Sequence, residues 1–274
     1  MAAARSPGPR PRKALGQHFL RDSGVLADVA GAVQVPEGGV VVEIGAGTGQ
    51  LTEALLARGF EVVALEIEER LVAHLRVRFR GEPRLRVVRA DARDVDFAHV
   101  VPPGRPFAVA GNLPYFAANP IIRHLLEGRP QPTMLVVMVQ REVAKELAAP
   151  AGHLSLLAVS VQLYAEPRLL FDVPPTAFDP PPAVHSSVVA LEVREQPLVP
   201  RERLDAFFEL VSKTFRNPRK QVHNSLARGV WLPKDGAAEA LELAGIDPMR
   251  RAETLSIADW LALLDACEKV RASA

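Results

Sequence analysis

Five short apolar runs recur between residues 40 and 139, and helical periodicity follows the first two of them. The runs are VVVEI (40–44), EVVALE (61–66), RVVRA (86–90), FAVAGN (107–112) and TMLVVMV (133–139). Almost continuously apolar strands that alternate with helices are typical of a parallel sheet covered by helices on both faces. The sequence therefore predicts an α/β fold with a doubly wound, mostly parallel sheet.

The pattern changes after residue 160. Strand-like segments at 162–173 and 185–194 flank the proline-rich stretch PPTAFDPPPAV, which predicts an antiparallel edge. Further on, an apolar stripe indicates a helix, and a capping box formed by Ser256 and Asp259 indicates another. The stripe consists of Leu204, Phe207, Phe208, Val211 and Phe215. We expect a basic N-terminal arm and motif over 1–22, a main α/β domain over 23–198 and a small all-helical domain over 199–274.

Composition argues against several classes of protein. The 274 residues include one cysteine, Cys267, which excludes an internal disulfide framework and a multi-cysteine metal site. The first 14 residues lack the apolar stretch of a secretory signal, and no apolar run reaches the length of about 18 residues that spans a bilayer. We therefore expect a cytoplasmic protein with no membrane segment, and no cluster of metal ligands indicates a metal site.

A glycine-rich loop, EIGAGTGQLT, follows the first apolar run and opens the first helix. Its glycines, among them Gly45 and Gly47, let the backbone approach a ligand closely. The dinucleotide fingerprint needs its third glycine at position 50, where Gln50 stands, so a nicotinamide oxidoreductase is disfavoured. The G-x-G-x-G pattern resembles the S-adenosylmethionine loop of class I methyltransferases.

Two acids at the ends of later strands support this interpretation. Glu66 ends the second apolar run, where it can accept hydrogen bonds from both ribose hydroxyls of the cofactor. Asp91 follows the third run and can accept a hydrogen bond from an adenine amino group. Both lie at the carboxyl ends of parallel strands, which is where ligands bind to sheets of this kind.

The turn GNLPYF carries the residues with the clearest chemical role. In S-adenosylmethionine methyltransferases that modify a planar nitrogen, a similar turn follows the fourth strand. The Asn112 side-chain oxygen and the Leu113 carbonyl can accept the two hydrogens of an adenine amine, Pro114 stiffens the turn, and Tyr115 can stack on the base. Such catalysis consists mostly of positioning and preorganised dipoles.

Two basic blocks indicate a polyanionic partner, although the net charge is only +1. Residues 1–21 carry five cations and 210–234 carry six, and neither block contains an acid. The alternative is a basic tail and a solvated helix face. The candidate RNA-binding residues are Arg12, Lys13, Arg216, Arg219 and Lys220.

The ordered motifs resemble KsgA-type small-subunit rRNA adenine-N6,N6 dimethyltransferases along nearly the whole chain. KALGQHFLRD matches the family signature before the first strand, in which His18 and Leu20 help to close over the cofactor. This chain has His18 where many members carry asparagine. The proline-rich segment at 173–189 also matches, and the resemblance implies that Phe178 faces Tyr115 across a flipped base. TFRNPRKQVHNSL matches the helical RNA-binding domain.

The resemblance also implies a substrate and a cofactor. The expected activity is transfer of methyl groups from S-adenosylmethionine to N6 of two adjacent adenosines in a hairpin loop near the 3′ end of small-subunit rRNA. The expected partner is that rRNA within an immature 30S subunit, and we expect a monomer. Two alternatives stay open. One is an Erm-like methyltransferase of large-subunit rRNA, and the other is a non-catalytic RNA-binding assembly factor.

Overall fold

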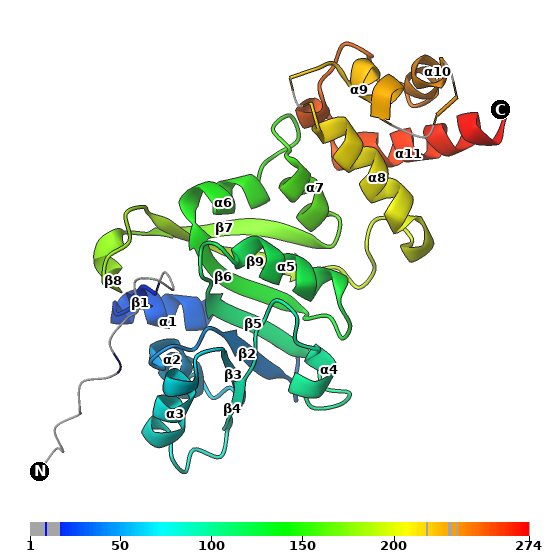
Figure 1. Ribbon diagram of the computed structural model, residues 1–274. Helices are drawn as coiled ribbons and strands as arrows, with labels where there is room; N and C mark the ends of the chain where they lie inside the picture. The colour runs from blue at the N-terminus through cyan, green and yellow to red at the C-terminus, as the bar shows by residue number, and fades with distance from the viewer. Residues whose placement is uncertain (1–8, 10–16, 218, 230–231, 234, 274) are drawn as a thin grey trace, which may run out of the picture. The chain divides into compact units, whose positions relative to one another are not determined.

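A seven-stranded sheet forms the framework of the first of two units (Figure 1). The strand order is β4-β3-β2-β5-β6-β9-β7. The strands are β2 (Val40–Ile44), β3 (Val62–Glu66), β4 (Leu85–Arg89), β5 (Phe107–Asn112), β6 (Met134–Gln140), β7 (Ala165–Val173) and β9 (Ser186–Val193). The pairs from β4 to β6 are parallel, and β9 pairs antiparallel with β6. The predicted parallel sheet with an antiparallel edge is confirmed.

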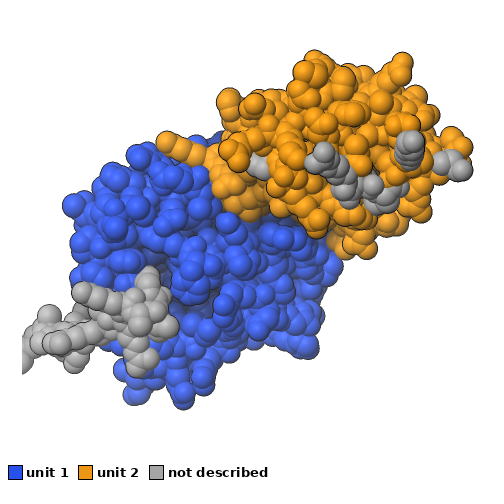
Figure 2. All heavy atoms as spheres, turned by 45° about the horizontal axis from the view of Figure 1, so that its top comes forward, with its two compact units in different colours: residues 1–144, 166–193 blue, residues 145–165, 194–274 orange. Residues whose placement is uncertain are grey.

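The structure is a computed structural model that describes residues 9, 17–217, 219–229, 232–233 and 235–273. Unit 1 comprises residues 1–144 and 166–193, and unit 2 comprises residues 145–165 and 194–274 (Figure 2). These units do not follow the predicted boundary at 198/199, because residues 145–165 and 194–198 group with the helical part. The division into functional domains stays a prediction. Arg12 and Lys13 lie outside the described residues.

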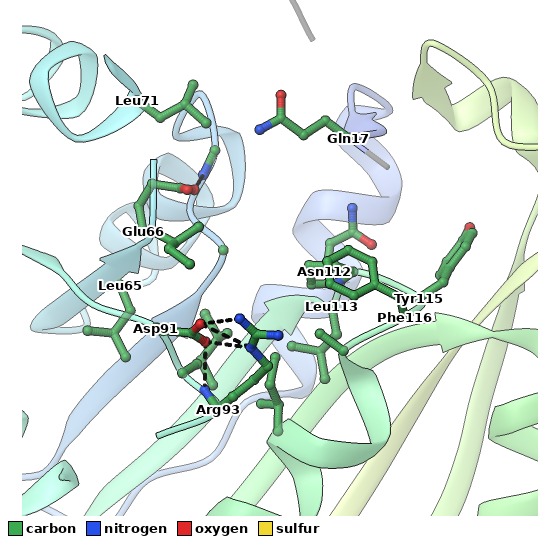
Figure 3. Close-up of a pocket in the computed structure, with 18 of the residues that line it drawn as sticks. Gln17, Leu65, Glu66, Leu71, Asp91, Arg93, Asn112, Leu113, Tyr115 and Phe116 are labelled. Carbon is green, nitrogen blue, oxygen red and sulfur yellow. Dashed lines mark hydrogen bonds and ion pairs between the residues drawn. The ribbon is translucent and has the colours of Figure 1, made fainter. Parts of the chain in front are cut away.

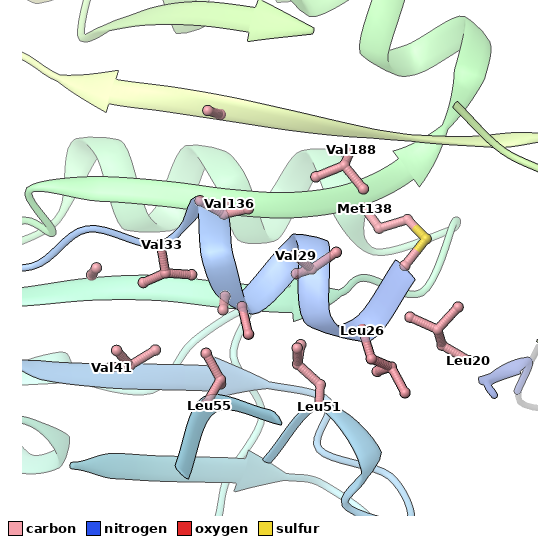
Figure 4. Packing of buried hydrophobic residues seen from close by; sticks show 14 of the residues in the cluster. Leu20, Leu26, Val29, Val33, Val41, Leu51, Leu55, Val136, Met138 and Val188 are labelled. Carbon is pink, nitrogen blue, oxygen red and sulfur yellow. The ribbon is translucent and has the colours of Figure 1, made fainter. Parts of the chain in front are cut away.

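One face of the sheet packs against α1 (Ser23–Ala32) and α2 (Gln50–Ala57). Leu26 and Val29 of α1 and Leu55 of α2 join the same buried cluster as Val136 and other strand residues (Figure 4). Residues of one strand that belong to this cluster are two positions apart, as Ala108 and Ala110 are, because alternate side chains point to the same face. This cluster is the hydrophobic core on the α1 and α2 face of the sheet.

Aromatic packing marks the opposite face. Phe107 lies next to Ala108 in β5 and so points away from the α1 face. Its ring stacks on Phe97 of α4 (Phe97–Val100), with centroids 6.1 Å apart. His124 of α5 (Ala118–Glu127) lies 5.7 Å from Phe97, which places α4 and α5 on this face. Helix α3 (Glu69–Arg78) packs against β3 and β4, and α6 (Arg141–Leu147) follows β6.

A small second sheet joins two segments that are far apart in the sequence. β1 (Phe19–Leu20) pairs antiparallel with β8 (Phe178–Asp179), with Leu20 opposite Phe178. The backbone N–H of Arg21 also donates to the carbonyl of Ala177 at 2.8 Å. The N-terminal signature is therefore attached to the proline-rich segment.

Unit 2 is helical, as predicted for the C-terminal part. Its helices are α7 (Leu156–Gln162), α8 (Leu204–Phe215), α9 (Val222–Gly229), α10 (Gly236–Leu243) and α11 (Ile257–Ala272). In α8, Phe207 and Val211 are fully buried, and in α11 Trp260 is fully buried. The capping box is confirmed, because Ser256 and Asp259 exchange side-chain to backbone hydrogen bonds of 3.0 and 2.8 Å.

Candidate functional site

A cavity of about 360 Å³ opens at the carboxyl ends of β2, β3 and β5 and beside the segment that follows β4 (Figure 3). A volume in this range suits a small-molecule ligand. Eight residues singled out from the sequence line the cavity together. They are His18, Gly45, Gly47, Glu66, Asp91, Asn112, Leu113 and Tyr115.

Glu66 ends β3 and is almost completely buried. Its Oε2 accepts the backbone N–H of Gly47 at 2.9 Å, and its Oε1 accepts that of Glu68 at 2.9 Å. Burial raises the pKa of Glu66, and these backbone donors oppose the rise because they favour the charged form. Since a carboxylate offers about four acceptor positions, the group can still accept hydroxyl hydrogens from a ligand.

Gly47 is required by the packing around it. Its φ of +57° lies in the left-handed region, and a Cβ at this position would lie 3.1 Å from Cε1 of Phe19 in β1. A side chain here would strain the backbone and would force the Phe19 ring to shift by a few tenths of an ångström. The absence of a side chain lets β1 pack over the loop while the Gly47 N–H reaches Glu66.

Asp91 follows β4 and is bound by Arg93, a residue not predicted from the sequence to belong to the site. Its Oδ1 accepts hydrogen bonds from the backbone N–H and the Nε of Arg93, both at 3.0 Å. Its Oδ2 accepts from Nε at 3.0 Å and from Nη2 at 2.5 Å (Figure 3). The hydrogen bonds from the Arg93 side chain lower the pKa of Asp91. An adenine amino group bound by Asp91 has to replace one of these donors.

The Asn112 amide is oriented by the N-terminal segment. Its Nδ2 donates to the carbonyl oxygen of His18 at 3.0 Å. This bond leaves Oδ1 as the acceptor, and no residue that the structure describes donates to it. Leu113 has a fully buried side chain, so it can offer a ligand only its backbone. Its N–H donates to the carbonyl of Met138 at 3.0 Å, which joins the turn to β6.

Tyr115 is held by residues from both ends of unit 1. Its hydroxyl forms a 2.8 Å hydrogen bond with the hydroxyl of Ser186, the first residue of β9. Its ring stacks with that of His18, with centroids 6.2 Å apart and planes at 22°. His18 Nδ1 lies 2.8 Å from the carbonyl oxygen of Pro180. Burial raises the pKa of Tyr115, so its hydroxyl keeps its proton near neutral pH.

Two predicted site residues do not line this cavity. Phe178 is buried in the core on the α1 and α2 face with Leu20, its partner in the β1–β8 pair. Leu20 borders a smaller neighbouring cavity of about 40 Å³ beside Gly45 and Asn112. The expectation that Phe178 faces Tyr115 gains no support from this arrangement, because pairing with β1 turns the ring into the core. The ring that faces Tyr115 here is His18.

The predicted RNA-binding cations of unit 2 are exposed. Arg216 follows α8, and Arg219 and Lys220 precede α9. None of the three forms an ion pair with a residue that the structure describes, whereas Lys213 in the same block pairs with Glu209. Their charges are therefore available to a polyanion.

Within the described part of the chain, no group of three or more His, Cys, Asp or Glu side chains could hold a metal ion. None of the described helices has the length and hydropathy needed to cross a membrane.

Comparison with known proteins gives concordant matches. The family model for ribosomal RNA adenine dimethylase matches residues 8–269. A Moorella thermoacetica protein named ribosomal RNA small subunit methyltransferase A is 41% identical, over 96% of this chain and 94% of its own. The structure of a Plasmodium falciparum dimethyladenosine transferase matches with a TM-score of 0.80 and 26% identity, over 93% of this chain and 98% of its own. The structure of the 23S rRNA methyltransferase ErmE matches with a TM-score of 0.73 and 28% identity, over 91% of this chain and 99% of its own.

The chain belongs to the ribosomal RNA adenine dimethylase family. The fold class, the enzyme class and the dependence on S-adenosylmethionine that the motifs predicted are confirmed for this dimethylase. The residues present fit this cofactor, because Glu66 retains free acceptor positions and the glycine loop carries no side chain that would fill the cavity. Which residues perform each role stays a prediction.

A second buried acid lies beside the glycine loop and was not predicted from the sequence. Glu43 of β2 is 1% exposed and accepts a hydrogen bond of 2.5 Å from the Thr52 hydroxyl. Burial raises its pKa from 4.5 to about 7, and nearby Glu66 adds to the rise. The signal in the sequence was a lone acid inside the apolar run VVVEI.

We predict that Glu43 makes stability depend on pH. The folded dimethylase holds this proton up to about pH 7, whereas the unfolded chain releases it near 4.5. The contribution of Glu43 to stability is therefore complete below pH 4.5 and is lost as the pH rises to about 7. Glu43→Gln keeps an acceptor for Thr52 but cannot ionise. In thermal unfolding from pH 5 to 8, its advantage over the parent should grow up to about pH 7 and then level off. Parallel curves for the two proteins would contradict this.

Proposed function

We propose that this dimethylase transfers methyl groups from S-adenosylmethionine to N6 of adenosines in small-subunit rRNA. The observation that supports this proposal most directly is the hydrogen bond from Asn112 Nδ2 to the His18 carbonyl. This bond leaves the amide oxygen as an acceptor in the cavity. Relatives that are 37–41% identical and carry a small-subunit methyltransferase name support the choice of subunit.

The cofactor would lie along the strand ends. Glu66 would accept the ribose hydroxyls, and Asp91 would accept the adenine amino group in place of an Arg93 donor. Gly45 and Gly47 would line the part nearest to the loop. When bound, S-adenosylmethionine supplies an electrophilic methyl group on its sulfonium.

The target amine would be held by Asn112 and Leu113. An adenine N6 is a poor nucleophile because its lone pair is delocalised into the ring. Hydrogen bonds from both amine hydrogens to Asn112 Oδ1 and the Leu113 carbonyl favour a more pyramidal nitrogen. The nitrogen loses its proton after it has gained the methyl group, so no side chain has to act as a base beforehand. Catalysis then depends on preorganised acceptors and on the position of the base.

The target base would stack on Tyr115 after leaving its own stack. Arg216, Arg219 and Lys220 would contact phosphates, which position an RNA without reading its sequence. We further propose that the target is a pair of adjacent adenosines near the 3′ end of the small-subunit rRNA, within an immature subunit. The enzyme would act as a cytoplasmic monomer.

Large-subunit methylation is the second candidate, because the ErmE structure matches over 91% of this chain. The test is to supply labelled S-adenosylmethionine with immature small subunits, naked small-subunit rRNA or naked large-subunit rRNA, and to identify the modified nucleosides by mass spectrometry. We expect N6,N6-dimethyladenosine in small-subunit rRNA. Label confined to large-subunit rRNA would favour the second candidate, and no transfer to any RNA would contradict the proposed activity.

Glu66→Ala should weaken S-adenosylmethionine binding by about 1.5–3 kcal/mol, the range for charge-assisted hydrogen bonds. Titration calorimetry measures this directly. The control is Glu69→Ala, which removes a mostly exposed carboxylate three residues further along, at the start of α3. The control should bind as the parent does. An unchanged affinity of a folded Glu66→Ala protein would refute the ribose assignment.

Removal of the exposed cations in unit 2 should change how RNA binding depends on salt. The triple variant Arg216→Ala/Arg219→Ala/Lys220→Ala should bind RNA more weakly. Its slope of log affinity against log salt should fall by roughly 0.7–0.9 for each lost phosphate contact. S-adenosylmethionine affinity should not change.

Filter binding across a salt series measures this slope. Arg58→Ala/Arg76→Ala/Arg80→Ala removes the same charge from exposed positions of unit 1 and is the matched control. Equal slopes for the two triple variants would mean that the unit 2 cations hold no phosphates.

A further inference from the structure

The hydroxyl of Tyr115 has no role in the proposed chemistry. Stacking on a base requires an aromatic ring, which phenylalanine would also supply. Yet this hydroxyl forms a 2.8 Å hydrogen bond with the hydroxyl of Ser186, which lies 71 residues further along the chain. The contact therefore calls for an explanation beyond stacking.

The two partners differ in how firmly the backbone holds them. Ser186 is fully buried and lies opposite Gln140 in the seven-residue ladder between β6 and β9. Tyr115 lies in the turn between β5 and α5, outside any ladder, and is partly exposed. The bond therefore joins the end of a side chain from a turn to a residue that the sheet ladder holds in place.

The protonation of Tyr115 excludes a role for its hydroxyl as a general base. A tyrosine that removed a proton from the target amine would need a pKa close to the working pH. Burial in this site raises the pKa of Tyr115 instead, so the hydroxyl stays protonated. It can then serve as a hydrogen-bonding partner but not as a base.

We propose that Ser186 is a positioning residue for methyl transfer. Its hydroxyl fixes the Tyr115 ring in the orientation on which the target adenine stacks, and so sets the angle at which N6 meets Asn112. This inference rests on the proposed stacking role of Tyr115. The stacked His18 ring restrains Tyr115 from one face, and Ser186 restrains the far end of the ring.

The test compares variants that share a shape but differ in the hydroxyl. Ser186→Thr keeps the hydroxyl and adds a methyl group to Cβ. Ser186→Val carries the same added methyl group and has a second one in place of the hydroxyl. We expect Ser186→Val to lower kcat about tenfold, with KM for RNA and S-adenosylmethionine affinity near those of the parent, because a lost hydrogen bond misplaces a reacting group. Ser186→Thr should recover most of kcat.

A double-mutant cycle shows whether Ser186 acts through Tyr115. Tyr115→Phe should lower kcat by the same factor as Ser186→Val, and the double variant should be no slower, since all three proteins lack the same bond. The pH profile of kcat should keep its shape in Tyr115→Phe. Additive losses, or a limb of the pH profile that disappears, would overturn the proposal.

Ser187→Ala is the matched control for damage to the strand. Ser187 is the next residue of β9, is also buried, and bonds to Asp172 at 2.5 Å instead of to Tyr115. The Ser187→Ala variant should keep the parental kcat. An equal loss of kcat in Ser187→Ala would mean that Ser186 serves only the strand.

Tyr115→Ala separates this inference from the proposed function. If Tyr115→Ala turned over as the parent does, the stacking role itself would be wrong, and the inference would fall with it. If Tyr115→Ala were slow while Ser186→Val and Tyr115→Phe kept the parental kcat, stacking would stand and the positioning role of Ser186 would be refuted.

Discussion

Parallel pairing of β4, β3, β2 and β5 is the constraint on which the site depends. Because these strands run in one direction, their carboxyl ends lie at one edge of the sheet. Each strand places one part of the site at this edge. The glycine loop follows β2, Glu66 ends β3, Asp91 follows β4 and Asn112 ends β5. The register that places Ile44 opposite both Leu65 and Gly111 keeps these ends level. A cofactor that lies across this edge of the sheet can therefore contact the glycine loop, Glu66 and Asp91. The base to be methylated can approach beside Asn112.

The edge alone does not complete the site, because contacts between distant parts of the chain orient its side chains. The His18 carbonyl, which holds the Asn112 amide, is 94 residues away in sequence, and Ser186 is 71 residues from Tyr115. The β1–β8 pair and the contact of His18 with Pro180 join the two segments that supply these partners. The amide and the ring that would handle the target adenine are thus set by the assembled unit and not by their own turn.

This division explains what could be predicted from sequence. The strands, the glycine loop and the acids at strand ends follow from local periodicity and from one rule about parallel sheets, so they were found. The burial of Phe178 was not foreseen, because it depends on β8 pairing with β1. Arg93 and Ser186 were missed for the same kind of reason. A basic residue in RADARD and a serine in a strand become informative only when the fold places them against Asp91 and Tyr115. If Tyr115 only stacked on the base, phenylalanine would serve equally well at this position. The hydrogen bond to Ser186 gives the tyrosine hydroxyl a role that phenylalanine lacks.

In the proposed mechanism, the Asn112 amide oxygen receives the target amine beside the cofactor. The most direct measurement is a crystal structure of the protein with S-adenosylhomocysteine and an RNA hairpin that contains the target adenosines. We expect the adenine N6 at about 2.7–3.2 Å from Asn112 Oδ1, with Nδ2 still bonded to the His18 carbonyl. An amide turned so that Nδ2 faces the base, or an adenine amine bound away from Asn112, would contradict it.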